Sequence, residues 1–184
     1  MSNSKLYTYI VACDNGGAPC VEEDCLTIAI CKPEIRRKVK VGDMIVGISS
    51  RKLGKNKKIL FMAKTTEVVS MEEYGDTQRS DSIYTSVLTM KPNPFHNYSD
   101  YERDMKGKNV ITSTDFIYFG KNHIDVPENL QEIIPRRGHR STKNDPFRQT
   151  LTSLFVSEKL NGTGKRGEYT DEKGRCGNKL RPET

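Results

Sequence analysis

Two groups of basic residues are candidates for binding phosphate. Residues 32–58 contain ten Lys or Arg against two Asp or Glu, and residues 135–184 contain twelve against six, in a chain of 184 residues with net charge +6. Two basic blocks can steer a polyanion onto one face through counterion release, although a solvated lysine surface has the same composition. The predicted phosphate-binding residues are Lys32, Arg36, Arg37, Lys38, Lys40, Arg51, Arg136, Arg137, His139 and Arg140.

The segment from Arg136 to Ser141 is the densest part of the second block. Three arginines lie within five residues around Gly138, which allows close approach of the backbone. Guanidinium groups at this spacing can hold phosphate in a bidentate manner, while a solvated loop is the alternative interpretation.

Aromatic rings and small polar groups near the ends of expected strands are candidates for a base-binding pocket. Such a pocket needs aromatic faces for stacking and hydroxyl, amide or carboxylate groups to read the edge of the base. For each Tyr, ordinary packing in the core is the competing interpretation. The predicted pocket residues are Tyr7, Asp14, Asn15, Ser49, Ser50, Tyr84, Asp115 and Tyr118.

Several enzyme classes lack their usual sequence signals. No Gly-x-Gly-x-x-Gly follows an expected strand and no Gly-x-x-x-x-Gly-Lys-Ser/Thr occurs, so neither a dinucleotide fold nor a P-loop is indicated. His96, His123 and His139 are scattered, and we interpret His96 and His123 as loop histidines. We therefore assign no catalytic residue in the leading interpretation.

The cysteines do not form a metal-binding pattern. Their count of five is odd, and the first four, Cys13, Cys20, Cys25 and Cys31, have six, four and five residues between them with no Cys-x-x-Cys. Zinc sites use close pairs, so we predict no metal and no cofactor. Free thiols are typical of a reducing compartment, and the chain has no apolar segment of roughly 18 residues. We therefore expect a cytoplasmic protein with no membrane partner.

These residues must be positioned by elements in which strands outnumber helices. Alternation and β-branched residues predict strands over 5–12, 25–31, 44–49, 59–69 and 110–119. Pro33 predicts a short helical turn through Lys38, and Ser70 is a plausible N-cap for a turn at 71–74. The segment 75–101 reads as irregular, and 145–160 as an amphipathic helix.

The fold class that follows is α+β, because strands and helices do not alternate regularly. With 34% hydrophobic residues and a mean hydropathy of −0.68, the core must be compact. We expect one domain over 1–160 and a flexible basic tail over 161–184, where Gly, Lys, Arg and Glu dominate.

An ordered set of motifs resembles a known family. The motifs are Tyr7-Thr-Tyr-Ile-Val-Ala-Cys-Asp14, Thr27-Ile-Ala-Ile-Cys-Lys-Pro-Glu-Ile-Arg-Arg37, Lys40-Val-Gly-Asp-Met-Ile-Val-Gly47, Met71-Glu-Glu-Tyr74, Asp81-Ser-Ile-Tyr84 and Asp115-Phe-Ile-Tyr-Phe-Gly120. Together they resemble the nucleotide-modification-associated domain family of the second type, found in bacteria and phages. The resemblance covers residues 5 to about 140.

The resemblance implies a fold and a class of ligand. Such families are placed with the PUA-like folds, alongside the ASCH, EVE and YTH domains, which implies a small, partly open β-barrel with a few short helices and the C-terminal amphipathic helix. It also implies binding of DNA, RNA or a nucleotide that carries a modified base. The sequence departs from the family pattern at Met44, where an aromatic is common after Gly-Asp.

Three functional hypotheses follow. The leading one is a non-catalytic reader of nucleic acid or a nucleotide with a modified base, in a base-modification or phage-defence system. The second is an amidohydrolase acting on modified nucleosides, since ASCH-like relatives use Lys, Thr and Glu and this chain has Lys64, Thr65 and Glu67; strand alternation makes that set geometrically poor. The third is a module that binds modification or defence proteins through the basic tail.

Overall fold

The computed structural model describes residues 4–77, 79–82, 95–96, 100–161 and 167–172. Within these residues the strands and helices follow the chain in this order: β1 (Leu6–Val11), β2 (Cys20–Glu22), β3 (Cys25–Ile28), α1 (Pro33–Lys38), β4 (Met44–Ser49), η1 (Arg51–Leu53), β5 (Lys58–Lys64), β6 (Glu67–Ser70), α2 (Met71–Gly75), α3 (Tyr101–Met105), β7 (Asn109–Ser113), β8 (Asp115–Tyr118), η3 (Gly120–Asn122), β9 (Ile124–Asp125), η4 (Glu128–Ile133), β10 (His139–Thr142) and α4 (Asp145–Leu160).

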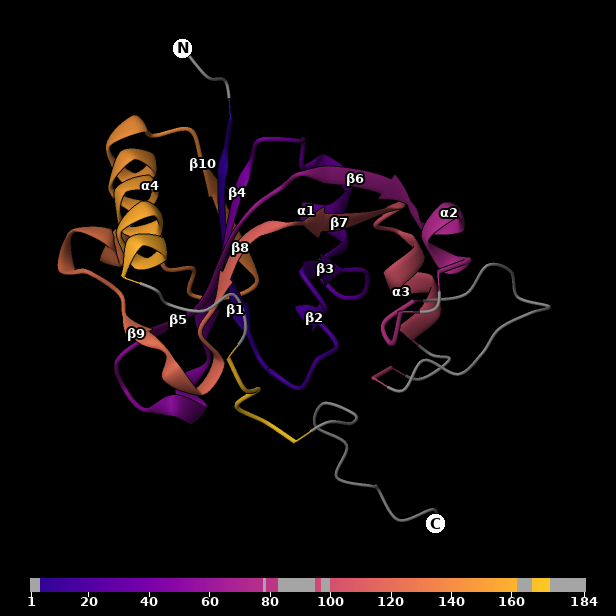
Figure 1. Cartoon of the computed structure of the whole chain (residues 1–184), viewed down its shortest axis with the longest axis horizontal. Helices are drawn as coiled ribbons and strands as arrows, with labels where there is room; N and C mark the ends of the chain where they lie inside the picture. Colours follow the sequence, from indigo (N-terminus) through magenta and orange to yellow (C-terminus); the bar gives the residue numbers. More distant parts are fainter. Residues whose placement is uncertain (1–3, 78, 83–94, 97–99, 162–166, 173–184) are drawn as a thin grey trace.

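The strands form two sheets. The first has the order β10-β1-β4-β5-β8, with β9 paired to β5, and β1 and β4 are parallel. The second has the order β2-β3-β7-β6 and is antiparallel. Figure 1 shows α4 against one side of the first sheet and the second sheet on its other side, with α2 and α3 beyond.

Two expected long strands bend from one sheet into the other. The apolar run 59–69 divides into β5 and β6, and the run 110–119 divides into β7 and β8. Hydrogen bonds hold the bends together, because the Thr66 amide donates to Thr112 O at 3.0 Å and the Thr114 amide to Thr66 Oγ1 at 3.1 Å. A strand that changes sheet makes a corner of the kind found in barrel-like sandwiches.

The α+β class with few short helices is confirmed, and so is the C-terminal helix. The barrel prediction holds only in part, because in the described part of the chain the two sheets share corners at Thr66 and Thr114 but do not close into one barrel. The sequence did not predict the short strands β2, β9 and β10, which contain two to four residues each.

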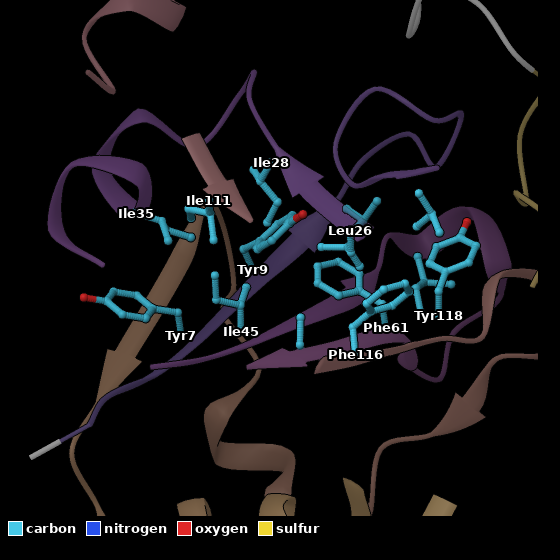
Figure 2. Packing of buried hydrophobic residues seen from close by; sticks show 14 of the residues in the cluster. Tyr7, Tyr9, Leu26, Ile28, Ile35, Ile45, Phe61, Ile111, Phe116 and Tyr118 are labelled. Carbon is cyan, nitrogen blue, oxygen red and sulfur yellow. The ribbon is translucent and has the colours of Figure 1, made fainter. Parts of the chain in front are cut away.

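The main apolar core lies between the two sheets. It contains Tyr9 from β1, Ile28 from β3, Phe61 from β5 and Phe116 from β8, all fully buried (Figure 2). A second cluster fills the space between the first sheet and α4, where Leu151 and Phe155 are buried. Both faces of β4 and β5 are therefore covered, which explains why these strands carry few polar residues.

A close approach of backbone and ring explains Gly47. This residue pairs with Phe61 across β4 and β5, and a Cβ at position 47 would lie 2.1 Å from a ring carbon of Phe61. Any larger residue would displace the ring, so glycine here allows the two strands to pack beside the core.

Candidate functional site

Asp14 and Tyr118, both predicted to line a pocket, bind each other in the interior. Tyr118 donates a hydrogen bond to Asp14 Oδ1 at 2.7 Å, and Thr170 donates to Asp14 Oδ2 from its amide at 3.1 Å and from its hydroxyl at 3.2 Å. The Asp14 amide in turn donates to Asp171 Oδ2. Burial raises the pKa of Asp14, while the hydrogen bonds from Tyr118 and Thr170 counteract this.

This network holds part of the segment predicted to be a flexible tail. The ring of Tyr169 packs edge-on against Tyr118 at 5.4 Å between centroids, and its hydroxyl accepts from the Val21 amide at 2.9 Å. The Gly167 amide donates to Tyr118 O at 2.8 Å. Residues 167–172 thus contact the body of the fold, whereas the domain limit at residue 160 stays a prediction.

The remaining predicted pocket residues do not gather around one cavity. Tyr7 is buried in the core and donates to Lys38 O. Ser49 Oγ accepts from the Lys58 amide, and Ser50 caps η1.

Asp115 lies elsewhere on the first sheet, in β8, beside Lys159 of α4. Asn15 lies next to Asp14 and lines a small cavity described below. Tyr84 lies outside the described residues.

Arg36 is the predicted phosphate ligand whose placement differs most from expectation. Its side chain is fully buried and donates to Cys31 O at 2.7 Å, to Asn109 O at 3.0 Å and to Asp104 O. Burial lowers the pKa of Arg36 to about 10, although Asp104 counteracts this. A guanidinium that serves these carbonyls is not available to phosphate, so we remove Arg36 from the proposed phosphate surface.

The two basic blocks nevertheless meet in the fold. β10 pairs with β1, which places His139 opposite Tyr9, and the charges of Lys38 and Lys32 from the first block act on His139. Burial first, and then these cations, lower the pKa of His139. A basic region therefore extends from α1 across β1 to β10.

One end of this region is a cavity of about 390 Å³ that is rich in lysine. It is lined by Lys38 and Lys40 from the first block, and by Lys5 and Lys143, which were not predicted. The one carboxylate in the lining, Asp43, accepts from the backbone amides of Lys5 and Lys40. The Asp43 carboxylate therefore stabilises the turn. Lysine is the commonest residue in the lining, and one of the four, Lys38, pairs through Nζ with Glu34 Oε2 at 3.1 Å.

The other predicted basic residues lie elsewhere on the surface. Arg37 forms an ion pair with Glu34 at 2.6 Å, Arg51 begins η1, and Arg140 donates to Glu132 O. Arg136 and Arg137 are exposed in the connection before β10. Lys32 donates to Ile10 O at 3.0 Å with its ammonium 4.8 Å from the ring centroid of Tyr9.

Cys31, His96 and Asp104 form a chain of contacts that the sequence did not predict. Cys31 Sγ lies 3.3 Å from His96 Nε2, and His96 Nδ1 lies 2.5 Å from Asp104 Oδ2. The second oxygen of Asp104 accepts from the Cys31 amide at 2.9 Å. A carboxylate, an imidazole and a thiol in this order match the constellation of a nucleophilic cysteine.

The electrostatics of the cluster favour a protonated imidazole. Burial lowers the pKa of His96, but the hydrogen bonds with Asp104 and Cys31 outweigh this effect and raise the pKa to about 10. Asp104 fixes a proton on Nδ1, so in the imidazolium form Nε2–H donates toward the sulfur. The imidazolium can therefore donate a hydrogen bond to the Cys31 sulfur.

The backbone that presents Cys31 is strained. Cys31 and Lys32 have φ values of 58° and 43°, a left-handed conformation that costs roughly 1–2 kcal/mol per non-glycine residue. The bond from Asp104 to the Cys31 amide and the buried Arg36 below it hold this turn at the start of α1. Such strain is often found at functional sites.

A cavity of about 70 Å³ opens beside the thiol. Its lining includes Cys31, His96, Lys32, Tyr9 and Phe95. Asn15 and Cys13 also line it. The His96 imidazole lies between Cys31 and Asp104, and the described residues contain no group of three or more side chains that could hold a metal ion.

Little in the sequence could have revealed this cluster. His96 and Asp104 lie 65 and 73 positions after Cys31, so no local spacing connects them. The only local signal is Cys31-Lys-Pro33 at the junction of a strand and a helix.

The comparisons with known proteins agree with the motifs. The chain matches the model of the family described as nucleotide modification associated domain 2 over residues 3–87 and 87–169. It belongs to this family, whose description connects the chain with nucleotide modification systems. A search of curated proteins finds no match. In the part of the chain that the structure describes, no helix is long and apolar enough to cross a bilayer.

Proposed function

We propose that this protein binds nucleic acid, or a nucleotide, that carries a modified base, as a reader or accessory protein of a base-modification or phage-defence system. The lysine-lined cavity carries the proposal, since four lysines and one aspartate line a volume of about 390 Å³ and give it a net positive charge that suits phosphate. Family membership supports the link to modified bases. We also propose that the fold is PUA-like and that the protein works in the cytoplasm, in contact with modification or defence proteins.

A ligand that contacts both cavities at once would have to be a polymer rather than a single nucleotide. The lysine-lined cavity lies at Lys5, before β1 begins, and the thiol cavity lies at Val11, where β1 ends. Six residues of a β-strand span roughly 20 Å. Successive phosphates of one nucleic-acid strand are about 3.4 Å apart along the helix axis. A ligand in contact with both cavities must therefore contain several nucleotides.

The geometry does not favour an amidohydrolase site made of Lys64, Thr65 and Glu67. Lys64 ends β5 in the first sheet, whereas Glu67 begins β6 in the second, and the buried hydroxyl of Thr65 between them has no hydrogen-bond partner. The chain corner at Thr66 separates the two charged groups.

The test is the salt dependence of binding, measured by fluorescence anisotropy with labelled DNA and RNA oligonucleotides. We expect Lys40→Ala/Lys143→Ala to reduce the slope of log K against log salt by about two, roughly one for each phosphate contact. The control Lys106→Ala/Lys121→Ala removes the same charge from exposed residues outside the cavity. Equal slopes in the two variants would contradict the assignment of the cavity. Absence of binding at low salt would overturn the nucleic-acid proposal and leave only a free nucleotide, which calorimetry would detect.

A further inference from the structure

The thiol cluster has the parts that an acyl-transfer site needs. Cys31 supplies a nucleophile, His96 a proton donor and acceptor 3.3 Å away, and Asp104 fixes the imidazole from its other side. Lys32 lines the same cavity and is the cation closest to Cys31 in the chain. Asp104 is fully buried, which preserves its bond to the imidazole from competition with water.

Cys20 and Cys25 lie in environments that make them poorer nucleophiles than Cys31. Burial and the charge of Asp81 raise the pKa of Cys20 to about 12, and burial raises the pKa of Cys25. Both stay protonated thiols at neutral pH, and a thiol is a poor nucleophile. Cys31 is half-buried and faces an imidazole at the cavity.

We propose that Cys31 is the nucleophile of a hydrolase that removes a small acyl group from an amino or hydroxyl group of its substrate. The cavity volume of about 70 Å³ sets the size of that group. It is about half of the volume of a cavity that admits benzene. A formyl, acetyl or carbamoyl group fits, whereas a whole nucleobase does not.

The reaction balances without an oxidant or a metal. Cys31 Sγ attacks the carbonyl carbon, a C–S bond forms, and the oxyanion develops in the cavity that Lys32 lines. The C–N or C–O bond then breaks, and the leaving amine or alkoxide takes the proton from His96 Nε2. Water loses a proton to the same nitrogen as it attacks the thioester, and the C–S bond breaks. The acid leaves as a carboxylate with its proton passed to solvent, and the sulfur and the imidazole return to their starting forms.

The identity of the acyl carrier rests on the proposed function. If the chain holds a nucleic acid through its lysines, the acyl group is the substituent of a modified base, such as an acylated exocyclic amine. The thiol chemistry itself does not depend on that assignment, so the two are tested with separate probes.

The first probe is p-nitrophenyl acetate with the full chain. We expect a burst of nitrophenolate and one acetyl group on the peptide that contains Cys31, measured by mass spectrometry. Cys31→Ala should abolish the burst. Cys25→Ala, which removes a half-buried thiol outside the lining, should keep it. His96→Gly should slow acylation at least about tenfold, and added imidazole should restore the rate, which a purely structural histidine would not allow.

Acetylation of Cys13, Cys25 or surface lysines at the same rate as Cys31 would overturn the proposal. Near-UV circular dichroism of each variant checks that it is folded. A burst retained in Cys31→Ala would also overturn it.

The second probe is N4-acetyl-2′-deoxycytidine compared with its N4-benzoyl analogue. We expect release of acetate, with the benzoyl compound turned over at least about tenfold more slowly because its ring exceeds the cavity. Acylation of Cys31 without nucleic-acid binding would overturn the proposed function alone. Salt-dependent binding without acylation of Cys31 would overturn the nucleophile alone.

Discussion

Two buried carboxylates, Asp14 and Asp104, are used in opposite ways in this fold. Asp14 is surrounded by donors from Tyr118 and Thr170, and its network closes the contact between the body and residues 167–172. Asp104 holds an imidazole whose other nitrogen faces a thiol at a cavity. Residue type therefore does not distinguish a structural carboxylate from a functional one. What distinguishes them is whether the partner of the carboxylate still faces space that a ligand can enter.

The largest effect should follow loss of the cation beneath the Asp104 network. Arg36→Met removes the donors to the carbonyls of Cys31, Asp104 and Asn109 and the charge that offsets Asp104. We expect a loss of about 3–5 kcal/mol in the free energy of unfolding, measured by denaturant titration. Arg37→Met, at the neighbouring exposed residue paired with Glu34, should cost about 0–1 kcal/mol. Similar losses in both variants would show that Arg36 does not support the cluster.

Removal of the Asp14 carboxylate should have the next largest effect. Asp14→Ala leaves the Tyr118 hydroxyl and the Thr170 amide without their acceptor, and each such buried group costs about 1–3 kcal/mol. A double-mutant cycle with Tyr118→Phe should show coupling, and proteolysis should cut residues 167–172 sooner than in the wild type. Unchanged cleavage would mean that Asp14 does not hold that segment.

A smaller effect should appear in the pH dependence of the free energy of unfolding, through His96 of the Asp104 network. The pKa of His96 is raised to about 10, so its protonated form stabilises the fold fully below the unfolded value of about 6.5. That contribution is lost as pH rises from about 6.5 through about 10. We expect His96→Asn to flatten the decline of the unfolding free energy in this window, measured by urea titration at several pH values. An unchanged decline would contradict the imidazolium assignment.

Local patterns predicted much of this fold but failed where distant segments meet. The N-cap at Ser70, the start of α1 at Pro33 and the helix at 145–160 depend on neighbouring residues, and the structure agrees with all three. The corners at Thr66 and Thr114 were missed because the apolar runs continue through them.

The same limit applies to the candidate site. Arg36 and Arg37 look alike in the sequence, and only the packing of α3 and β7 against α1 buries one of them. The contacts among Cys31, His96 and Asp104 span segments that no periodicity connects. The meeting of the two basic blocks also depends on a distant pairing, because β10, which the sequence did not predict, pairs with β1.

The most direct test of the contrast between the carboxylates is the rate at which iodoacetamide labels Cys31, followed by peptide mass spectrometry in Asp104→Asn and Asp14→Asn. Asp104→Asn should slow labelling about tenfold, a change of roughly 1.4 kcal/mol in activation free energy, because the imidazolium loses its partner. Asp14→Asn should leave the rate within about twofold of wild type, since its network does not include the thiol. Equal rates in both variants, or a larger effect of Asp14→Asn, would contradict the account.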